Sequence, residues 1–260
     1  MKIRAKKHLG QHFLTDENIA RKIVESLGSS GYDQILEIGP GTGVLTKYLL
    51  EKNQKLFLSE IDVESIDFLK VNFPENINEN TFVGDFLKIN IDEKFAEQIA
   101  VIGNFPYNIS SQILFKIVES FQKIPEMVGM FQKEVAQRIA AVPRNKDYGI
   151  LSVLVQAYYD VEYLFTVSEN VFNPPPKVKS GVIKLTRNVK NGLENNEEIF
   201  KKIVKAGFNQ RRKKLSNALK IIDIPENLKS HPFMDCRAEE LSVEDFINFA
   251  KLWKGETKIF

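Results

Sequence analysis

Four consecutive residues, Asn104-Phe105-Pro106-Tyr107, carry groups that could act together on an amine attached to a planar base. The Asn104 side-chain oxygen and the Phe105 main-chain carbonyl are two acceptors for the two hydrogens of such an amine. Held in this way, the nitrogen becomes pyramidal and directs its lone pair at an electrophile, so the transition state gains more than the ground state. Pro106 fixes the local backbone through its φ angle. Tyr107 offers a ring face for stacking, worth roughly 1–3 kcal/mol per base.

A glycine-rich stretch predicts a ligand-binding loop. Gly39, Gly41 and Gly43 alternate with other residues between the apolar segment 35–38 and a helix that begins near Val44. Glycines let a ligand approach bare backbone, and the helix N-terminus that follows favours an anionic group. A dinucleotide fingerprint needs its third glycine where Val44 stands. A nicotinamide-dependent oxidoreductase is therefore disfavoured, and the chain also lacks a plausible hydride-transfer site.

Polar residues also follow other apolar segments that read as strands. Glu60 comes 21 residues after Gly39 and directly after segment 55–59, while Asp85 follows segment 81–83. The carboxyl ends of parallel strands are where ligand groups gather in such folds. A carboxylate at Glu60 suits two ribose hydroxyls, and Asp85 suits the amine of an adenine. We therefore expect Glu60, Asp85 and Asn104 to share one pocket.

The pattern of the chain predicts the fold that positions these groups. Strands alternate with helices, which indicates a parallel sheet with right-handed crossovers. The fold class is α/β, a Rossmann-like sheet of seven strands with the last one antiparallel as part of an edge hairpin. The predicted strands are 35–38, 55–59, 81–83, 99–103, 127–131, 158–167 and 180–185. Residues 1–185 would form this domain, and 186–260 a small helical domain.

Composition narrows the class of protein. The chain has 260 residues, 43% of them hydrophobic and 27% charged, which is typical of a soluble globular protein. No apolar run reaches the ~18–20 residues of a membrane span, and the basic N-terminus lacks an apolar signal core. A single cysteine, Cys236, allows no internal disulfide and no zinc cluster. We expect a cytoplasmic protein without a metal or a membrane partner.

Two basic segments suggest contact with a polyanion. Residues 1–15 and 199–222 contain lysines and arginines but no acid, although the net charge is only +2. Lysine and arginine chiefly position phosphates rather than read sequence. The candidate contacts are Lys6, Lys7, Arg211, Arg212, Lys213 and Lys214.

Five stretches together resemble the ribosomal RNA adenine N6-dimethyltransferase family, and most closely its bacterial small-subunit members. They are residues 9–14, 37–46, 104–108, 172–178 and 208–215. The resemblance implies a class I methyltransferase that uses S-adenosyl-L-methionine and releases S-adenosyl-L-homocysteine. Its substrate would be two adjacent adenosines in a hairpin loop near the 3′ end of 16S rRNA, within the immature 30S subunit. A monomer is expected.

The same resemblance assigns roles to residues of this chain. It implies cofactor binding by His12, Leu14, Gly39, Gly41, Glu60, Asp85 and Asn104. From the residues themselves, we also expect Phe172, which precedes three prolines, to stack on the base opposite Tyr107, in a site completed by Asn104, Phe105 and Pro106. Phe105 stands where the family is expected to have leucine, and Lys179 where an acid is more usual. Because residues 6–14 precede a helix predicted to start at Thr15-Asp16-Glu17 and to close at Gly28, they could fold over a ligand.

Two alternatives remain open at this point. The related large-subunit (23S) adenine methylases that confer macrolide resistance are less well matched by segment 172–178 and by the basic cluster 211–214. A protein that mainly binds and checks the assembling subunit is a hypothesis of a different class.

Overall fold

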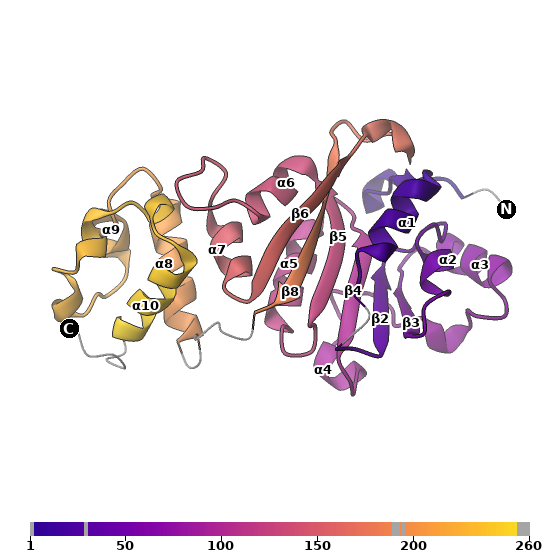
Figure 1. The fold of residues 1–260 in the computed structure, drawn as a ribbon, viewed down its shortest axis with the longest axis horizontal. Helices are drawn as coiled ribbons and strands as arrows, with labels where there is room; N and C mark the ends of the chain where they lie inside the picture. The colour runs from indigo at the N-terminus through magenta and orange to yellow at the C-terminus, as the bar shows by residue number, and fades with distance from the viewer. Residues whose placement is uncertain (1–2, 29–30, 189–192, 194–195, 254–260) are drawn as a thin grey trace. The chain divides into compact units, whose positions relative to one another are not determined.

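The computed structural model describes residues 3–28, 31–188, 193 and 196–253, and its contacts group the chain into two units (Figure 1). The first unit is formed by 1–136 and 161–187, and the second by 137–160 and 188–260. A single boundary at 185/186 was expected. The grouping by contacts differs from it in two respects, because segment 137–160 belongs with the C-terminal helices and the later boundary lies at 187/188.

The first unit is built on a six-stranded sheet in the order β3-β2-β4-β5-β8-β6. Strands β2, β3, β4 and β5 are parallel, while β8 runs antiparallel to β5 from Gln132↔Ser180 to Glu126↔Thr186. The α/β class and the antiparallel last strand are therefore confirmed. The strands are β2 (Gln34–Ile38), β3 (Lys55–Ser59), β4 (Ile99–Asn104), β5 (Glu126–Gln132), β6 (Tyr159–Val167) and β8 (Ser180–Arg187).

The prediction of seven strands was wrong by one. Residues 81–83 form only an isolated parallel bridge, Leu58↔Phe82, beside the edge strand β3. A 3-10 turn occupies Glu79–Thr81, so too few extended residues remain for a ladder. The last two strands form the expected pair at the edge of the sheet: β8 lies between β5 and β6, and β6 is the outermost strand.

Helices pack against this sheet because their apolar residues recur on one side. Ala20, Ile23 and Val24 of α1 are buried in the same core cluster as residues of β2, β4 and β5. Asp16 caps α1 by accepting hydrogen bonds from the Asn18 and Ile19 amides. The helices are α1 (Glu17–Glu25), α2 (Thr46–Leu49), α3 (Val63–Asn72), α4 (Ile91–Lys94), α5 (Ser110–Glu119) and α6 (Lys133–Ile139).

The register of the parallel strands aligns their carboxyl ends. Ile38 pairs with Ser59 and Glu37 with Ile102, so the chain leaves β2, β3 and β4 at the same edge of the sheet. A second, two-stranded sheet pairs β1 (Phe13–Leu14) with β7 (Phe172–Asn173) in antiparallel fashion. It joins the N-terminal segment to the loop before β8.

The second unit is helical. Its core contains Phe200 and Val204 of α8 together with Phe246 and Phe249 of α10. A capping box precedes α10, since the Asp245 amide donates to Ser242 Oγ (3.1 Å) and the Ser242 amide to Asp245 Oδ2 (2.8 Å). The helices are α7 (Ile150–Gln156), α8 (Glu197–Asn209), α9 (Leu215–Ala218) and α10 (Val243–Trp253). Within the described ranges, no helix has the length and apolar character to cross a bilayer.

Candidate active site

A cavity of about 280 Å³ opens at the carboxyl ends of β2, β3 and β4. Its walls come from the N-terminal segment, the glycine loop, the ends of the strands and the start of α5. They are Leu9 to Phe13, Gly39 and Gly41, Glu60 and Ile61, Asp85 and Leu87, and Asn104 to Ile109. The expected convergence of Glu60, Asp85 and Asn104 is therefore present in the structure.

Asn104 is the last residue of β4, and the NH₂ group of its side-chain amide already has a partner. Its Nδ2 donates to the main-chain carbonyl of His12 at 2.9 Å. A carbonyl can only accept, so this bond fixes which end of the amide is the donor. No group in the described part of the chain donates to Asn104 Oδ1, and this oxygen is free to accept.

The Phe105 ring lies in the core, while its main chain borders the cavity. The side chain is 1% exposed and packs edge-on against Phe131, with ring centroids 5.1 Å apart. A Cβ on Gly103 would lie 2.7 Å from the Phe105 ring, and one on Gly129 would lie closer still. Glycines on two neighbouring strands thus make room for a ring larger than the expected leucine.

Tyr107 is held in place by two other segments. Its hydroxyl lies 2.6 Å from Ser180 Oγ, and its ring stacks on His12 with centroids 5.6 Å apart and planes 29° apart. Burial raises the pKa of the Tyr107 hydroxyl, against the opposing effect of the Ser180 bond. His12 Nδ1 lies 2.8 Å from the Pro174 carbonyl and must donate to it. The aromatic face in the cavity is therefore fixed before any ligand enters.

Glu60 presents a buried carboxylate at the end of β3. Its Oε1 accepts from the amides of Ile61 (2.8 Å) and Asp62 (2.9 Å), and its Oε2 from the Gly41 amide at 3.3 Å. Burial raises the pKa of this carboxyl, and the three amide bonds oppose that rise. The long bond to Gly41 leaves Oε2 able to accept from a better-placed donor, as a ribose hydroxyl would be.

Asp85 is more exposed than Glu60. Its Oδ1 accepts from the Leu87 amide at 3.0 Å, and Oδ2 lies 3.6 Å from the Lys88 ammonium. The side chain is 30% exposed. Asp85 therefore keeps acceptor capacity for an amine in the cavity.

Glu37 has a feature that the sequence analysis did not assign. It is 1% exposed, and the Thr46 hydroxyl donates to its Oε2 at 2.7 Å. Burial raises the pKa of Glu37 to about 8, against the Thr46 bond and with a further rise from the nearby Glu60 charge. The signal in the sequence was a single acid within the apolar run Ile35 to Ile38.

Two predicted residues lie beside the cavity rather than in its wall. Leu14 is 3% exposed and borders a small adjoining hollow of about 20 Å³ with Glu37 and Gly39. Phe172 pairs with Leu14 in the two-stranded sheet and is 4% exposed. Its stacking on a base stays a prediction, and it would require the ring to be uncovered.

Comparison with known proteins assigns the family. The model of the family described as ribosomal RNA adenine dimethylase matches residues 2–254. The chain belongs to this family. The resemblance seen in the sequence is thereby confirmed, and with it a methyltransferase fold.

Relatives of this dimethylase family member include proteins named ribosomal RNA small subunit methyltransferase A. The one from Cytophaga hutchinsonii is 54% identical and covers 98% of this chain and 99% of its own length. The one from Flavobacterium johnsoniae is 56% identical, with 95% and 94% covered. A crystal structure of a dimethyladenosine transferase from Plasmodium falciparum superposes with a TM-score of 0.80 at 26% identity, covering 94% of this chain and 98% of that one.

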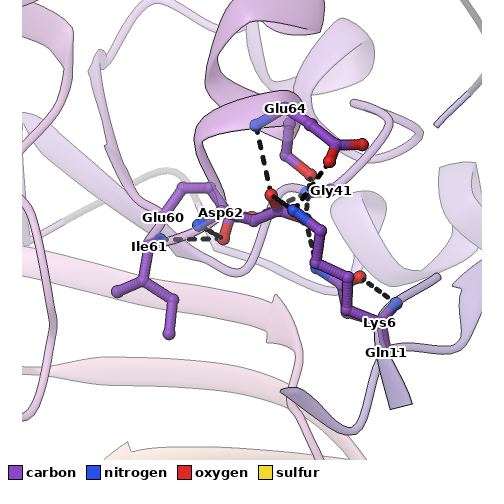
Figure 2. A network of polar contacts seen from close by, with 8 residues as sticks. Lys6, Gln11, Gly41, Glu60, Ile61, Asp62 and Glu64 are labelled. Carbon is purple, nitrogen blue, oxygen red and sulfur yellow. Dashed lines mark hydrogen bonds and ion pairs between the residues drawn. The ribbon is translucent and has the colours of Figure 1, made fainter. Parts of the chain in front are cut away.

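The basic residues of this family member fall into two groups. Lys6 is paired with Asp62 (2.5 Å) and Glu64 (3.1 Å), as Figure 2 shows, whereas the exposed Lys7 side chain makes no ion pair with any described residue. Of the six cations assigned to RNA, Lys6 therefore already has two acidic partners.

The second unit shows the same division. Arg211 is bonded to Glu239 (2.5 Å) and to the carbonyls of Lys146 (2.6 Å) and Asn145 (3.2 Å). Lys214 is paired with Asp235 at 2.9 Å. Arg212 and Lys213 are exposed, and among the described residues neither has an ion-pair partner. Nor does any group of three or more acidic, histidine or cysteine side chains in the described ranges suit a metal ion.

Proposed function

We propose that this protein dimethylates the N6 amines of two adjacent adenosines in the hairpin loop near the 3′ end of 16S rRNA, within the immature 30S subunit. The observation that carries the proposal is the pair of acceptors at the end of β4. Asn104 donates to the His12 carbonyl and keeps Oδ1 as an acceptor, next to the Phe105 main chain that borders the same cavity.

These acceptors suit the poor nucleophile that an adenine amine is. Its lone pair is shared with the ring until both hydrogens are held out of the ring plane. Asn104 Oδ1 and the Phe105 carbonyl would hold them there, and the stacked Tyr107 ring would support the base. The nitrogen becomes acidic once it has taken a methyl group, so the site needs no dedicated general base.

The residues that line the cavity would suit S-adenosyl-L-methionine, which supplies a sulfonium-bound methyl group and leaves as S-adenosyl-L-homocysteine. Glu60 would accept from the ribose hydroxyls and Asp85 from the adenine amine. The glycine loop would approach the amino-acid end. His12 and Leu14 would close the cavity over it.

The RNA would be held through its backbone by exposed cations. Lys7, Arg212 and Lys213 support this role best because none is paired with a described acid. Lys6, Arg211 and Lys214 were assigned to RNA as well, and their role there would require exchange of their present partners. We further propose that residues 186–260 contact RNA, and that the protein acts as a monomer in the cytoplasm.

The test is methylation of a defined substrate. Purified protein is incubated with isotope-labelled S-adenosyl-L-methionine and immature 30S subunits, and the RNA is digested to nucleosides. We expect label only in N6,N6-dimethyladenosine from 16S rRNA. Label in 23S rRNA would favour the large-subunit alternative, and label in cytosine or protein would refute the proposal.

A second experiment separates catalysis from assembly control. A variant without methyl transfer, Asn104→Ala, is expressed in cells that lack the enzyme. If it restored subunit maturation fully, the protein would act mainly as a binding factor that checks assembly.

A further inference from the structure

Asp62 lies two residues after Glu60, the residue proposed to bind the ribose of the methyl donor. Its carboxylate accepts four hydrogen bonds. The residue is 2% exposed. Its Oδ1 accepts from Lys6 Nζ (2.5 Å) and the Glu64 amide (3.1 Å), and its Oδ2 from Gln11 Nε2 (2.9 Å) and Ser65 Oγ (3.4 Å). Capping α3 accounts for only part of this, because two of the donors come from the N-terminus of the chain (Figure 2).

Gln11 connects these contacts to the residue that acts on the amine. Its Oε1 accepts from the Lys6 amide at 2.8 Å while its Nε2 donates to Asp62, so both ends of the amide are used. The next residue is His12, whose carbonyl holds Asn104 Nδ2. On the other side, the Asp62 amide donates to Glu60 Oε1 at 2.9 Å. Asp62 thus links Glu60, which would bind the ribose of the methyl donor, to Asn104, which would bind the target amine.

The N-terminal segment, residues 6–14, lies directly on the site. The Phe13 ring covers the glycine loop so closely that a Cβ on Gly41 would lie 2.8 Å from it. Gly10, at φ +67°, faces Asn108, where a Cβ would lie 2.6 Å from Oδ1. These contacts are short-range packing contacts. The charged contacts that hold the beginning of the segment are those of Lys6 with Asp62 and Glu64, and of these two acids Asp62 also accepts from Gln11.

We propose that Asp62 is a positioning residue, which ties the N-terminal segment down through Lys6 and Gln11 and thereby aligns Asn104 with Glu60. The inference rests on the proposed function, in which Asn104 binds the amine and Glu60 the donor. Asp62 touches neither substrate in this assignment. It acts through the His12 carbonyl on one side and through the Glu60 carboxylate on the other.

The chemistry of the four contacts explains why a carboxylate is needed. Both Asp62 oxygens face donors, and its pKa is lowered because Lys6, Gln11 and the Glu64 amide outweigh the opposing effect of burial. An amide at this position would turn its NH₂ group toward either Lys6 and the Glu64 amide or Gln11. Asp62→Asn keeps the size of the side chain and sets a donor against a donor.

The experiment compares two neighbouring lysines. Lys6→Met and Lys7→Met remove the same charge one position apart, so a loss that comes from weaker RNA attraction should appear in both. Three quantities are measured: hydrogen exchange of amides 6–14, the Kd for S-adenosyl-L-methionine without RNA, and kcat with saturating 30S subunits. We expect Lys6→Met to raise the hydrogen exchange rate of amides 6–14 about tenfold. The Kd for S-adenosyl-L-methionine should rise about tenfold and kcat should fall about tenfold. Lys7→Met should leave the exchange and the Kd unchanged.

Two further variants complete the test. Lys6→Arg should restore protection and kcat to within about threefold, since an arginine can still reach a carboxylate. Asp62→Asn should lose at least as much protection from exchange and as much kcat as Lys6→Met. The double variant should lose no more of either than Asp62→Asn alone. If Asp62→Asn fails to fold, the lysine pair still tests whether the ion pairs of Lys6 tie the N-terminal segment down.

The outcomes separate this inference from the proposed function. Equal exchange and equal Kd in Lys6→Met and Lys7→Met, with a wild-type enzyme that dimethylates 16S rRNA, would overturn the positioning role alone. A wild-type enzyme that makes no dimethyladenosine would overturn the proposed function, while the exchange measurement would still test whether Asp62 holds the N-terminal segment.

Discussion

The cavity at the strand ends and the basic turn at residues 211–214 are both rich in polar side chains, but they are organised differently. In the cavity, Asn104 is bonded to a residue 92 positions away and Tyr107 to one 73 positions away. In the basic turn, two cations are paired with acids and the two between them, Arg212 and Lys213, point to no acid among the described residues.

The difference follows from burial. A buried polar group costs about 1–3 kcal/mol if it has no partner, and the partly buried Asn104 and Tyr107 are each held in one geometry by a distant part of the chain. Exposed cations are hydrated, so they need no partner within the protein. We therefore expect the cavity to respond to pH and to single atoms, and the basic turn to respond to salt and to the number of charges.

The largest effect should come from Asn104. Asn104→Ala removes the acceptor for the amine, and we expect kcat to fall about 10³-fold, while the Kd for the methyl donor changes less than about tenfold. Lys213→Ala, the matched control in the basic turn, should leave kcat at saturating RNA within about twofold. Single-turnover methylation and calorimetry measure the two quantities. Equal losses of kcat in both variants would contradict the contrast between the regions.

Glu37 should make the cavity region sensitive to pH. Its pKa is about 8 in the folded protein and 4.5 when unfolded. Between these values the folded state keeps a proton that the unfolded state releases, so stability falls as pH rises from about 4.5 to 8. Glu37→Gln cannot lose a proton. Its stability relative to wild type should therefore grow by roughly 4 kcal/mol over this window.

Urea unfolding of the ligand-free protein at pH 5 and pH 8.5 measures that difference. Glu239→Gln, which replaces a 29% exposed acid paired with Arg211 outside the cavity, serves as the control. A constant difference between Glu37→Gln and wild type would mean that Glu37 is ionised in the folded protein at both values.

The sequence predicted much of the cavity because parallel strands of an α/β fold bring their ends together. Glu60, Asp85 and Asn104 could be placed in one pocket from the strand pattern alone, and the structure agrees. The sequence could not show that residues 81–83 would form a single bridge, since a short apolar run looks the same whether or not a 3-10 turn precedes it.

Charge patterns were less informative than strand patterns. Lys6 and Arg211 were assigned to RNA because they lie in runs without acids, yet their partners are 56 and 28 positions away in the sequence. Ion pairs between distant residues depend on the fold, which a local run of charges does not contain. The burial of Phe172 has the same origin, because it follows from pairing with Leu14.

Arg211 should therefore matter for stability. Arg211→Ala breaks the Glu239 pair and frees two carbonyls, and we expect a loss of about 1–2 kcal/mol, reduced by the partial exposure of the side chain. Arg212→Ala, its exposed neighbour, should stay within about 0.5 kcal/mol of wild type. Urea unfolding measures both. If Arg212→Ala lowered the free energy of unfolding as much as Arg211→Ala does, the Arg212 side chain would also make a stabilising contact.

The two unpaired cations should matter for RNA. Arg212→Ala with Lys213→Ala removes two charges, and the slope of log K against log salt for a single-stranded rRNA fragment should become shallower by about 1.4. Affinity at physiological salt should fall about fivefold to tenfold. Replacing Lys201 and Lys205 of α8 by alanine removes the same charge elsewhere in the same basic segment. If both pairs changed the slope equally, RNA contact would spread over the whole segment rather than centre on the turn.

The smallest effect should come from Ser180, which holds Tyr107 from outside the cavity. Ser180 is fully buried and its Oγ lies 2.6 Å from the Tyr107 hydroxyl, so Ser180→Ala removes the partner that orients this hydroxyl. The ring should then sample more orientations, and we expect kcat to fall about threefold with an unchanged Kd for the methyl donor. Tyr107→Phe removes the hydroxyl itself and leaves Ser180 unpaired, so the double variant should lose little more than either single one. If the losses multiplied instead, Ser180 would act on the site by a route other than Tyr107, and the cavity would be less tightly interlocked than its hydrogen bonds indicate.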